Sequence, residues 1–146
     1  MKEKFMVTYE SEIKKINSNA ENIFNKFVDL QNLNKLINSK LNEDQIKDIK
    51  FTEDGFSFSI EGLGRIGFRM VEKDPFKTIK FELQELPVQA NAWIQLMEKD
   101  ENDTRMRLTF KAEIPAMLKM MVDKKLKEGV NLAAEVIANA FNNANS

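Results

Sequence analysis

The sequence lacks both cysteine and histidine, and each absence excludes classes of chemistry. Without cysteine there are no disulfides, thiolate nucleophiles or cysteine-ligated metals, and a reducing compartment is compatible with the composition. Without histidine the commonest general base near neutral pH and the commonest metal ligand are missing. Any catalysis would rest on carboxylates, lysines, arginines or the single tyrosine, Tyr9. We expect no metal, no cofactor and no catalytic motif, and the composition favours a protein that is not an enzyme.

Long hydrophobic runs and an excess of one charge are also missing. No window approaches the ~20 apolar residues of a membrane span, and the N-terminal residues lack the apolar core of a signal peptide. The 22 basic and 23 acidic side chains give a formal charge of −1, which provides no overall attraction to nucleic acid. The 146 residues suit one domain with a substantial core. The sequence predicts a cytoplasmic protein with a single domain over residues 1–146, no transmembrane segment and no nucleic-acid partner.

Glycine is scarce, yet three of the five glycines share one short segment, "EGLGRIGF". Gly62, Gly64 and Gly67 have the spacing G-x-G-x-x-G, which in a dinucleotide-binding unit follows a strand and opens a helix. Here the alternation of apolar and polar residues continues with period two beyond Gly67, so no helix follows. We interpret the segment as a β-hairpin in which Gly62 and Gly64 take positive φ. Gly67 would mark a bulge or a close backbone approach.

The hydrophobic period changes twice along the chain. Residues 5–16 predict a first strand with a bulge near residues 14 and 15, and Ser18 to Glu21 predicts a capping box that opens a helix. A second short helix is expected from Asp29. Period two then continues through residues 46–114, which predicts an antiparallel meander. After Pro115, expected at the first helical position, one long helix is predicted by the apolar stripe Leu118, Val122, Leu126, Val130, Ala133, Ile137 and Phe141.

This order of elements resembles the helix-grip fold of the START-related superfamily, also called SRPBCC. Its members include the birch-pollen allergen proteins and the polyketide cyclase and lipid-transport proteins. The resemblance covers nearly the whole chain and includes the segments "INSNAENIFNKFVDLQNLNKL", "GLGRIGFRMVEKDPFKTIKFE" and "LTFKAEIPAMLKMMV". It implies an α+β fold in which a seven-stranded antiparallel sheet wraps a long C-terminal helix, with two short helices after the first strand. It also implies a cavity that commonly holds lipids, sterols, hormones or polyketides, and it transfers no catalytic residue to this chain.

The apolar parity of the strands predicts which side chains face the helix. The predicted ligand-binding residues are Phe56, Phe58, Phe68, Met70, Phe81, Leu83, Ile94, Leu108 and Phe110 on the strands and Leu126, Gly129 and Ala133 on the helix. A glycine inside a helix costs about 1 kcal/mol relative to alanine, so Gly129 indicates either close packing or open space. The alternative is that the phenylalanines close a solid core. Tyr9 and Ser11 share the inward parity of the first strand, whereas Arg65, Arg69, Trp93 and Gln95 are expected on the convex face.

The start of the long helix combines methionine with lysine. At 100° per residue Met117 and Met121 lie away from the apolar stripe, beside Lys119, Lys124, Lys125 and Lys127. One interpretation is a portal formed by Met117, Met121, Lys124 and Lys125, in which adaptable methionines line an opening and lysines attract an acidic headgroup or a membrane surface. The other is an ordinary soluble helix whose methionines pack under a loop.

Three functions remain open from the sequence. The first is non-catalytic binding or transport of a small hydrophobic or amphipathic ligand, of a lipid, sterol-like or polyketide-like kind. The second is an enzyme of the cyclase or dehydratase type that uses a cavity carboxylate or Tyr9, which a carboxylate with a raised pKa would support. The third is an interaction module that forms a homodimer through Trp93 and Met97 on the exposed sheet face.

Overall fold

The structure is a computed structural model that describes residues 4–31, 46–60, 64–86 and 88–144. Its elements follow in the order β1 (Lys4–Glu10), β2 (Lys14–Ile16), α1 (Ala20–Val28), β3 (Ile46–Phe51), β4 (Gly55–Ile60), β5 (Gly64–Asp74), β6 (Thr78–Gln84), β7 (Ala90–Asp100), β8 (Asp103–Pro115) and α3 (Ala116–Ala144). Most of the second short helix, and Gly62 of the hairpin, lie outside the described residues.

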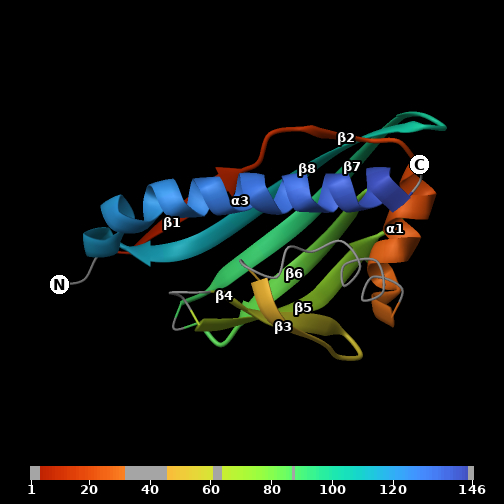
Figure 1. Ribbon diagram of the computed structural model, residues 1–146. Helices are drawn as coiled ribbons and strands as arrows, with labels where there is room; N and C mark the ends of the chain where they lie inside the picture. The colour runs from red at the N-terminus through yellow and green to blue at the C-terminus, as the bar shows by residue number, and fades with distance from the viewer. Residues whose placement is uncertain (1–3, 32–45, 61–63, 87, 145–146) are drawn as a thin grey trace.

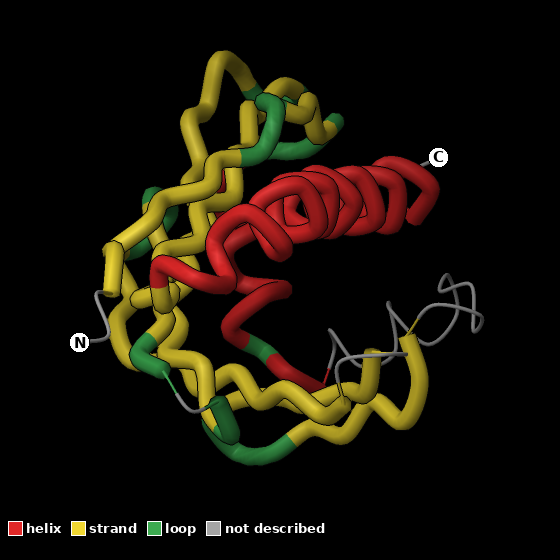
Figure 2. Tube along the Cα trace, turned by 90° about the vertical axis from the view of Figure 1, so that its left-hand side faces the viewer, coloured by secondary structure: helices red, strands yellow, loops and turns green. Residues whose placement is uncertain are grey.

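All described strands join one antiparallel sheet, as the period-two pattern predicts. The order across the sheet is β1-β8-β7-β6-β5-β4-β3, and β2 pairs with β8 beyond the end of β1. Successive strands from β3 to β8 are neighbours, which is the predicted meander. The sheet curves around α3, so that β3, β4 and β5 form an arm opposite the helix (Figures 1 and 2). The predicted helix-grip architecture is confirmed.

The glycine-rich segment is a hairpin between two antiparallel strands. β4 pairs with β5 from Gly55↔Arg69 to Ile60↔Gly64, and no helix follows Gly67. Gly64 has a φ of 88°, as expected for a tight turn. The expectation of a bulge at Gly67 is wrong, because Gly67 pairs in register with Gln84 and the irregularity falls between Met70 and Glu72. The dinucleotide interpretation is excluded by this topology.

The predicted first strand is divided into β1 and β2, because the Ser11 side chain accepts a hydrogen bond from β8 in place of a backbone carbonyl. The Ser11 N–H donates to the Leu108 carbonyl at 2.8 Å, and the Leu108 N–H donates to the Ser11 hydroxyl oxygen at 2.9 Å. Between the pairs Glu10↔Thr109 and Lys14↔Met106 the first segment contains one more residue than β8. The break therefore lies at residues 11–13, earlier than the predicted bulge at residues 14 and 15.

Helix α1 begins one residue later than the capping-box pattern predicts. The N-cap is Asn19, whose side-chain oxygen accepts the Asn22 N–H at 2.7 Å. Ser18 instead accepts from the Asn22 side-chain amide through its hydroxyl and from the Thr104 hydroxyl through its carbonyl, both at 2.7 Å. The bond from the Thr104 hydroxyl to the Ser18 carbonyl ties the start of α1 to β8. A contact distant in sequence therefore shifts the N-cap from Ser18 to Asn19.

Helix α3 begins directly after Pro115, which ends β8 opposite Lys4 of β1. Its 29 residues span about 44 Å at 1.5 Å per residue. Its main backbone neighbours are β8, β1 and β2, at one end of the sheet order. In the C-terminal half Ala134, Ala138 and Phe141 are buried, whereas Ala133 is exposed. The predicted stripe is therefore wrong at Ala133 and also at Leu118, which is exposed at the start of α3. Alanines at positions 134 and 138 pack α3 closely against the sheet.

Two glycines provide a matched test of the backbone. A Cβ on Gly55 would overlap the Phe68 carbonyl oxygen across the β4–β5 ladder, and it would lie 3.1 Å from the Arg69 Cα. A Cβ on Gly129 of α3 meets nothing within 4 Å. We expect Gly55→Ala to lower the free energy of unfolding by about 2 kcal/mol, and Gly129→Ala to raise it by up to about 1 kcal/mol. Urea unfolding measures both, and a Gly55→Ala protein as stable as the parent would contradict the close approach.

Candidate ligand-binding site

The concave face of the sheet, which faces α3, carries a continuous row of side chains. Strand registers place Tyr9 opposite Phe110, Phe110 opposite Ala92, Ala92 opposite Phe81 and Phe81 opposite Met70. A second row crosses β4, β5 and β6 as Phe56, Phe68 and Leu83. Because side chains alternate between the faces of a strand, paired residues share one face. The predicted inward parity is confirmed for these strands.

Four phenylalanines form an aromatic cluster on the arm of the sheet: Phe56, Phe58, Phe68 and Phe81. Phe68 stacks on Phe56 with ring centroids 5.0 Å apart and on Phe58 at 5.4 Å. Phe81 meets Phe56 edge-on at 5.8 Å. Phe81 is buried, whereas the other three are only partly buried. The cluster therefore presents ring surface on the concave side.

The buried core is divided into two clusters. One lies between α1, β2 and the C-terminal half of α3 and includes Ile16, Ile23 and Phe141. The other surrounds Tyr9 and Ala112. Phe68 and Ala92 pack against both clusters and are only partly buried themselves. Phe68 and Ala92 thus connect the two clusters without being fully covered.

The predicted site residues occupy three environments. Phe81, Leu83 and Ile94 are buried in the core. A larger set is partly buried on the concave face or on α3: Phe56, Phe58, Phe68, Met70, Leu108, Phe110 and Leu126. Gly129 and Ala133 are exposed, and open space rather than close packing surrounds the Gly129 backbone. The structure thus brings together the predicted strand residues, while two of the three helix positions lie at an uncovered part of α3.

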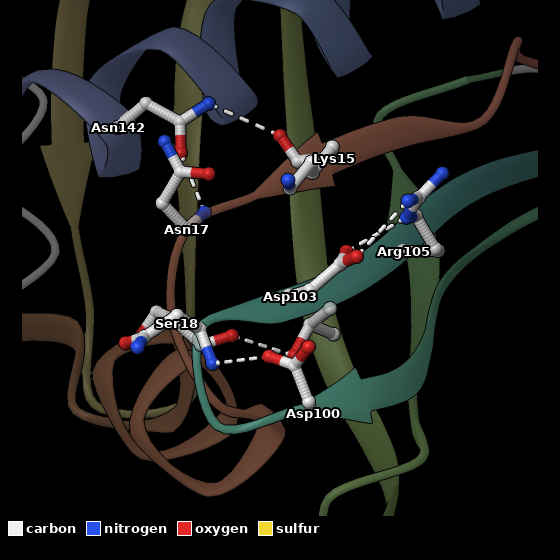
Figure 3. Close-up of polar contacts among 9 residues, drawn as sticks. Lys15, Asn17, Ser18, Asp100, Asp103, Arg105 and Asn142 are labelled. Carbon is white, nitrogen blue, oxygen red and sulfur yellow. Dashed lines mark hydrogen bonds and ion pairs between the residues drawn. The ribbon is translucent and has the colours of Figure 1, made fainter.

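A polar stripe on α3, formed by Asp123, Asn131 and Asn142, binds the N-terminal strands. The Asn131 side-chain oxygen accepts the Glu12 N–H at 2.8 Å. The Asn142 amide accepts the Asn17 N–H at 2.8 Å and donates to the Lys15 carbonyl at 3.0 Å (Figure 3). These bonds attach α3 to β2 and to the segment that joins β1 to β2.

The opposite side of α3, which we call the open flank, contains Gly129 and Ala133. Each lies two residues from Asn131, which is about 200° around a helix. Because Asn131 contacts the segment after β1, the open flank is turned away from β1 and β2. Leu126, one turn before Val130, is partly buried beside this flank. The sequence analysis identified Gly129 and Ala133 as small residues, but only the structure gives the direction in which they face.

Tyr9, Asp123 and Lys119 form a polar trio where β1 meets the first turns of α3. The buried Tyr9 hydroxyl donates to Asp123 Oδ1, and Lys119 Nζ donates to Asp123 Oδ2 at 3.1 Å. Burial, together with the hydrogen bond to Asp123, raises the pKa of Tyr9 to about 12. The hydrogen bonds from Tyr9 and Lys119 lower the pKa of the Asp123 carboxyl. Sequence reasoning missed Asp123, although its spacing of eight residues from Asn131 would have placed both on nearby parts of one helix face.

The predicted portal residues are exposed at the start of α3. Met117 is 85% exposed and Met121 is 71% exposed. Lys124 Nζ lies 4.0 Å from Glu128 Oε1, and Lys125 is exposed. Lys119 belongs to the polar trio instead, so it differs from the other lysines of this segment.

The convex face carries the polar pairs that the sequence pattern assigns to it. Arg69 pairs with Glu82 at 3.2 Å across β5 and β6. The Lys80 ammonium lies 5.5 Å from the centroid of the Trp93 ring. Met97, the other residue predicted for a dimer face, is 63% exposed. Trp93 is therefore partly covered by a neighbouring strand's lysine rather than freely presented.

In the part of the chain that the structure describes, no group of acidic side chains is arranged to hold a metal ion. The helices described there include none with the length and apolar character needed to cross a bilayer.

The titration of Tyr9 tests the polar trio directly, because Tyr9 is the only tyrosine. We expect tyrosinate absorbance of the folded protein to rise with a midpoint of about 12, against about 10 in denaturant. A raised pKa means that this contact contributes full stability below about pH 10 and loses it as pH rises towards about 12. Asp123→Asn should lower the folded midpoint while leaving it above about 10, because burial is the larger cause. A folded midpoint equal to that in denaturant would contradict the contact.

No protein-family model and no curated protein sequence matches this chain. Solved structures are similar at low identity. A norcoclaurine synthase point mutant from Thalictrum flavum, in complex with a transition state analogue, has a TM-score of 0.76 at 11% identity over 99% of both chains. The same plant's enzyme with dopamine and hydroxybenzaldehyde gives 0.73 at 10% identity, over 97% of this chain and 87% of that one. The Mll3558 protein from Rhizobium loti gives 0.65 at 14% identity, over 94% and 99%. This chain therefore has the helix-grip fold that its sequence pattern predicts, as these structures do.

Proposed function

We propose that this protein binds a small hydrophobic or amphipathic molecule between the concave face of the sheet and α3, without catalysing a reaction. The observation that carries the proposal is the partly buried aromatic cluster facing a helix whose open flank is uncovered at Gly129 and Ala133. Exposed aromatic surface favours an apolar occupant, because removing apolar area from water yields about 25 cal/mol per Å². A ligand of lipid, sterol-like or polyketide-like character fits this surface.

The fold of the similar structures is compatible with the binding of a small ligand. Norcoclaurine synthase has been solved with dopamine and hydroxybenzaldehyde, which are small aromatic molecules. An architecture that holds such molecules in that enzyme is suited to a related use here. The identity of 10% transfers the fold alone, so the proposal depends on the residues of this chain.

An enzyme of the cyclase or dehydratase type is the alternative, and the polar trio disfavours it. A general acid or base works best when its pKa lies near the working pH. The pKa of Tyr9 is raised to about 12, while that of Asp123 is lowered. The pKa of Asp103, at the start of β8, is also lowered, by a hydrogen bond from Arg105. These shifts move the groups away from neutral pH, which suits binding better than proton transfer.

A homodimer through the convex face is the other alternative. Met97 is exposed, but the Trp93 ring lies beneath Lys80. Large exposed apolar patches mark interaction surfaces, whereas here the exposed Met97 lies four residues along β7 from a partly buried Trp93. The aromatic cluster brings more apolar side chains together, so we favour ligand binding.

We further propose that the start of α3 serves as the portal. Met117, Met120 and Met121 are all strongly exposed there. Unbranched methionines adapt to different apolar surfaces, and Lys124, Lys125 and Lys127 add positive charge nearby. Ligand exchange at an anionic bilayer would therefore take place next to the end of α3 that lies beside β1.

Filling the open flank should block the ligand. We expect Ala133→Trp to weaken the binding of an uncharged environment-sensitive naphthalene dye by about tenfold or more, equivalent to about 1.4 kcal/mol. The new ring would occupy the space opposite the aromatic cluster. Leu132→Trp is the matched control, because Leu132 is the preceding residue and is exposed on the outer side of α3. Dye fluorescence titration measures both variants. Absence of dye binding to the parent protein, or equal binding by both variants, would remove the basis of the proposed function.

Removing the portal lysines should slow transfer from charged membranes. We expect Lys124→Gln, Lys125→Gln and Lys127→Gln together to reduce dye uptake from anionic vesicles, because each lysine near such a surface contributes about 1 kcal/mol. The difference should shrink as salt rises, since the Debye length falls from about 30 Å at 0.01 M to about 10 Å at 0.1 M. Lys77→Gln with Lys99→Gln is the control, at exposed positions outside α3. Equal transfer rates for the two proteins at low salt would show that the portal lysines only solvate the helix.

A further inference from the structure

The polar trio of Tyr9, Asp123 and Lys119 borders the apolar surface of the proposed ligand site. The Tyr9 ring stacks on Phe110 with centroids 6.4 Å apart, at the end of the row that crosses to Met70. Val122, next to Asp123 on α3, packs against the same core cluster as Tyr9. A molecule lying along this row would therefore have its far end beside the trio.

The trio retains capacity for further hydrogen bonds. The side chains of Lys119 and Asp123 are 40% and 43% exposed. An ammonium has three N–H donors, and each carboxylate oxygen has two lone pairs. Lys119 donates to Asp123 Oδ2, and Asp123 Oδ1 accepts from Tyr9, so donors and acceptors remain side by side. Ser11 differs, because its hydroxyl already donates to the Glu12 carbonyl and accepts from Leu108 N–H.

The charges of the trio are balanced, and this selects the kind of headgroup. Asp123 is negative, Lys119 is positive, and Tyr9 is neutral at physiological pH. A ligand carboxylate would be attracted by Lys119 but repelled by Asp123, and a ligand ammonium would meet the reverse, so a charged headgroup gains little from the pair. A hydroxyl group both donates and accepts, so it can donate to the Asp123 carboxylate while accepting from Lys119.

We propose that Tyr9, Asp123 and Lys119 anchor the hydroxyl group of an otherwise apolar ligand, with Tyr9 as the positioning residue that orients Asp123. This inference rests on the proposed function and names the chemical class of its ligand, an uncharged alcohol or phenol. The hydroxyl lies against α3 next to β1, and the apolar body extends along the row from Phe110 towards Met70 and the aromatic cluster.

The test compares two probes at neutral pH, naphthol and its methyl ether, in which a methyl group replaces the hydroxyl hydrogen. Displacement of the uncharged naphthalene dye measures the affinity of each. The parent protein should bind naphthol about tenfold more tightly than the ether, because hydrogen bonds to charged groups are stronger than neutral ones. The double variant Tyr9→Phe with Asp123→Leu removes the carboxylate without leaving a hydroxyl unpaired. It should bind the two probes about equally while its affinity for the ether stays the same.

Two further variants keep the outcome interpretable. Asp123→Asn retains an acceptor for the Tyr9 hydroxyl, so it provides the test if the double variant does not fold. We expect it to show an intermediate preference for naphthol over the ether. Asp103→Asn is the matched control, since Asp103 also pairs closely with a cation, Arg105 at 2.7 Å, but sits at the β7–β8 turn. Asp103→Asn should keep the full preference for naphthol over the ether. An unchanged preference in the Asp123 variants would overturn the anchor and leave the proposed function standing. Failure of the parent protein to bind either probe would overturn both.

Discussion

The attachment of α3 to β8, β1 and β2, at one end of the sheet order, is the constraint on which the rest of the structure depends. Asp123, Asn131 and Asn142 bind Tyr9 and the backbone that follows β1. Alanines at positions 134 and 138 let the helix lie close to the sheet there. Because all these contacts are on one side, the helix does not cover the arm formed by β3, β4 and β5 (Figure 2). The open flank and the partly buried phenylalanines opposite it are consequences of that asymmetry.

The same attachment brings polar and apolar chemistry to one place. Tyr9 is the only tyrosine of the chain, and it lies where a buried strand residue meets the helix. Its hydroxyl needs a partner in that position, since a buried polar group without a hydrogen bond is costly. Asp123 provides the partner and is itself stabilised by Lys119. One interaction therefore satisfies the fold and leaves charged atoms at the border of the aromatic surface.

Local patterns were enough to predict the strands and the long helix, because period two and period 3.6 persist over many residues. The faces of β4 to β8 followed from the same alternation, as Phe68 and Phe81 illustrate. The errors occur where a distant residue decides a local choice. Thr104 binds the Ser18 carbonyl and Asn19 becomes the cap of α1. Ser11 replaces a backbone group opposite Leu108 and interrupts the first strand.

The helix side of the site was harder to predict than its strand side. A stripe at 100° per residue passes between positions 133 and 134, and only contact with the sheet decides that Ala134 is buried. Asp123 carried no signal of its own among the many charged residues of α3. Its partner Tyr9 lies 114 residues earlier in the chain. A hydrogen bond between residues so far apart in the chain depends on the complete topology of the sheet and α3, so a local sequence pattern does not predict it.

The amide of Asn142 connects the end of α3 to residues 15 and 17, so β2 and the last described element meet in one side chain (Figure 3). During synthesis every strand of the sheet leaves the ribosome before α3 does. Domains generally fold as units during synthesis, and here the core that includes Ile16 and Ile23 is incomplete until α3 has supplied Ala134, Ala138 and Phe141. A chain that stops before α3 would therefore leave apolar side chains of β2 and α1 in water.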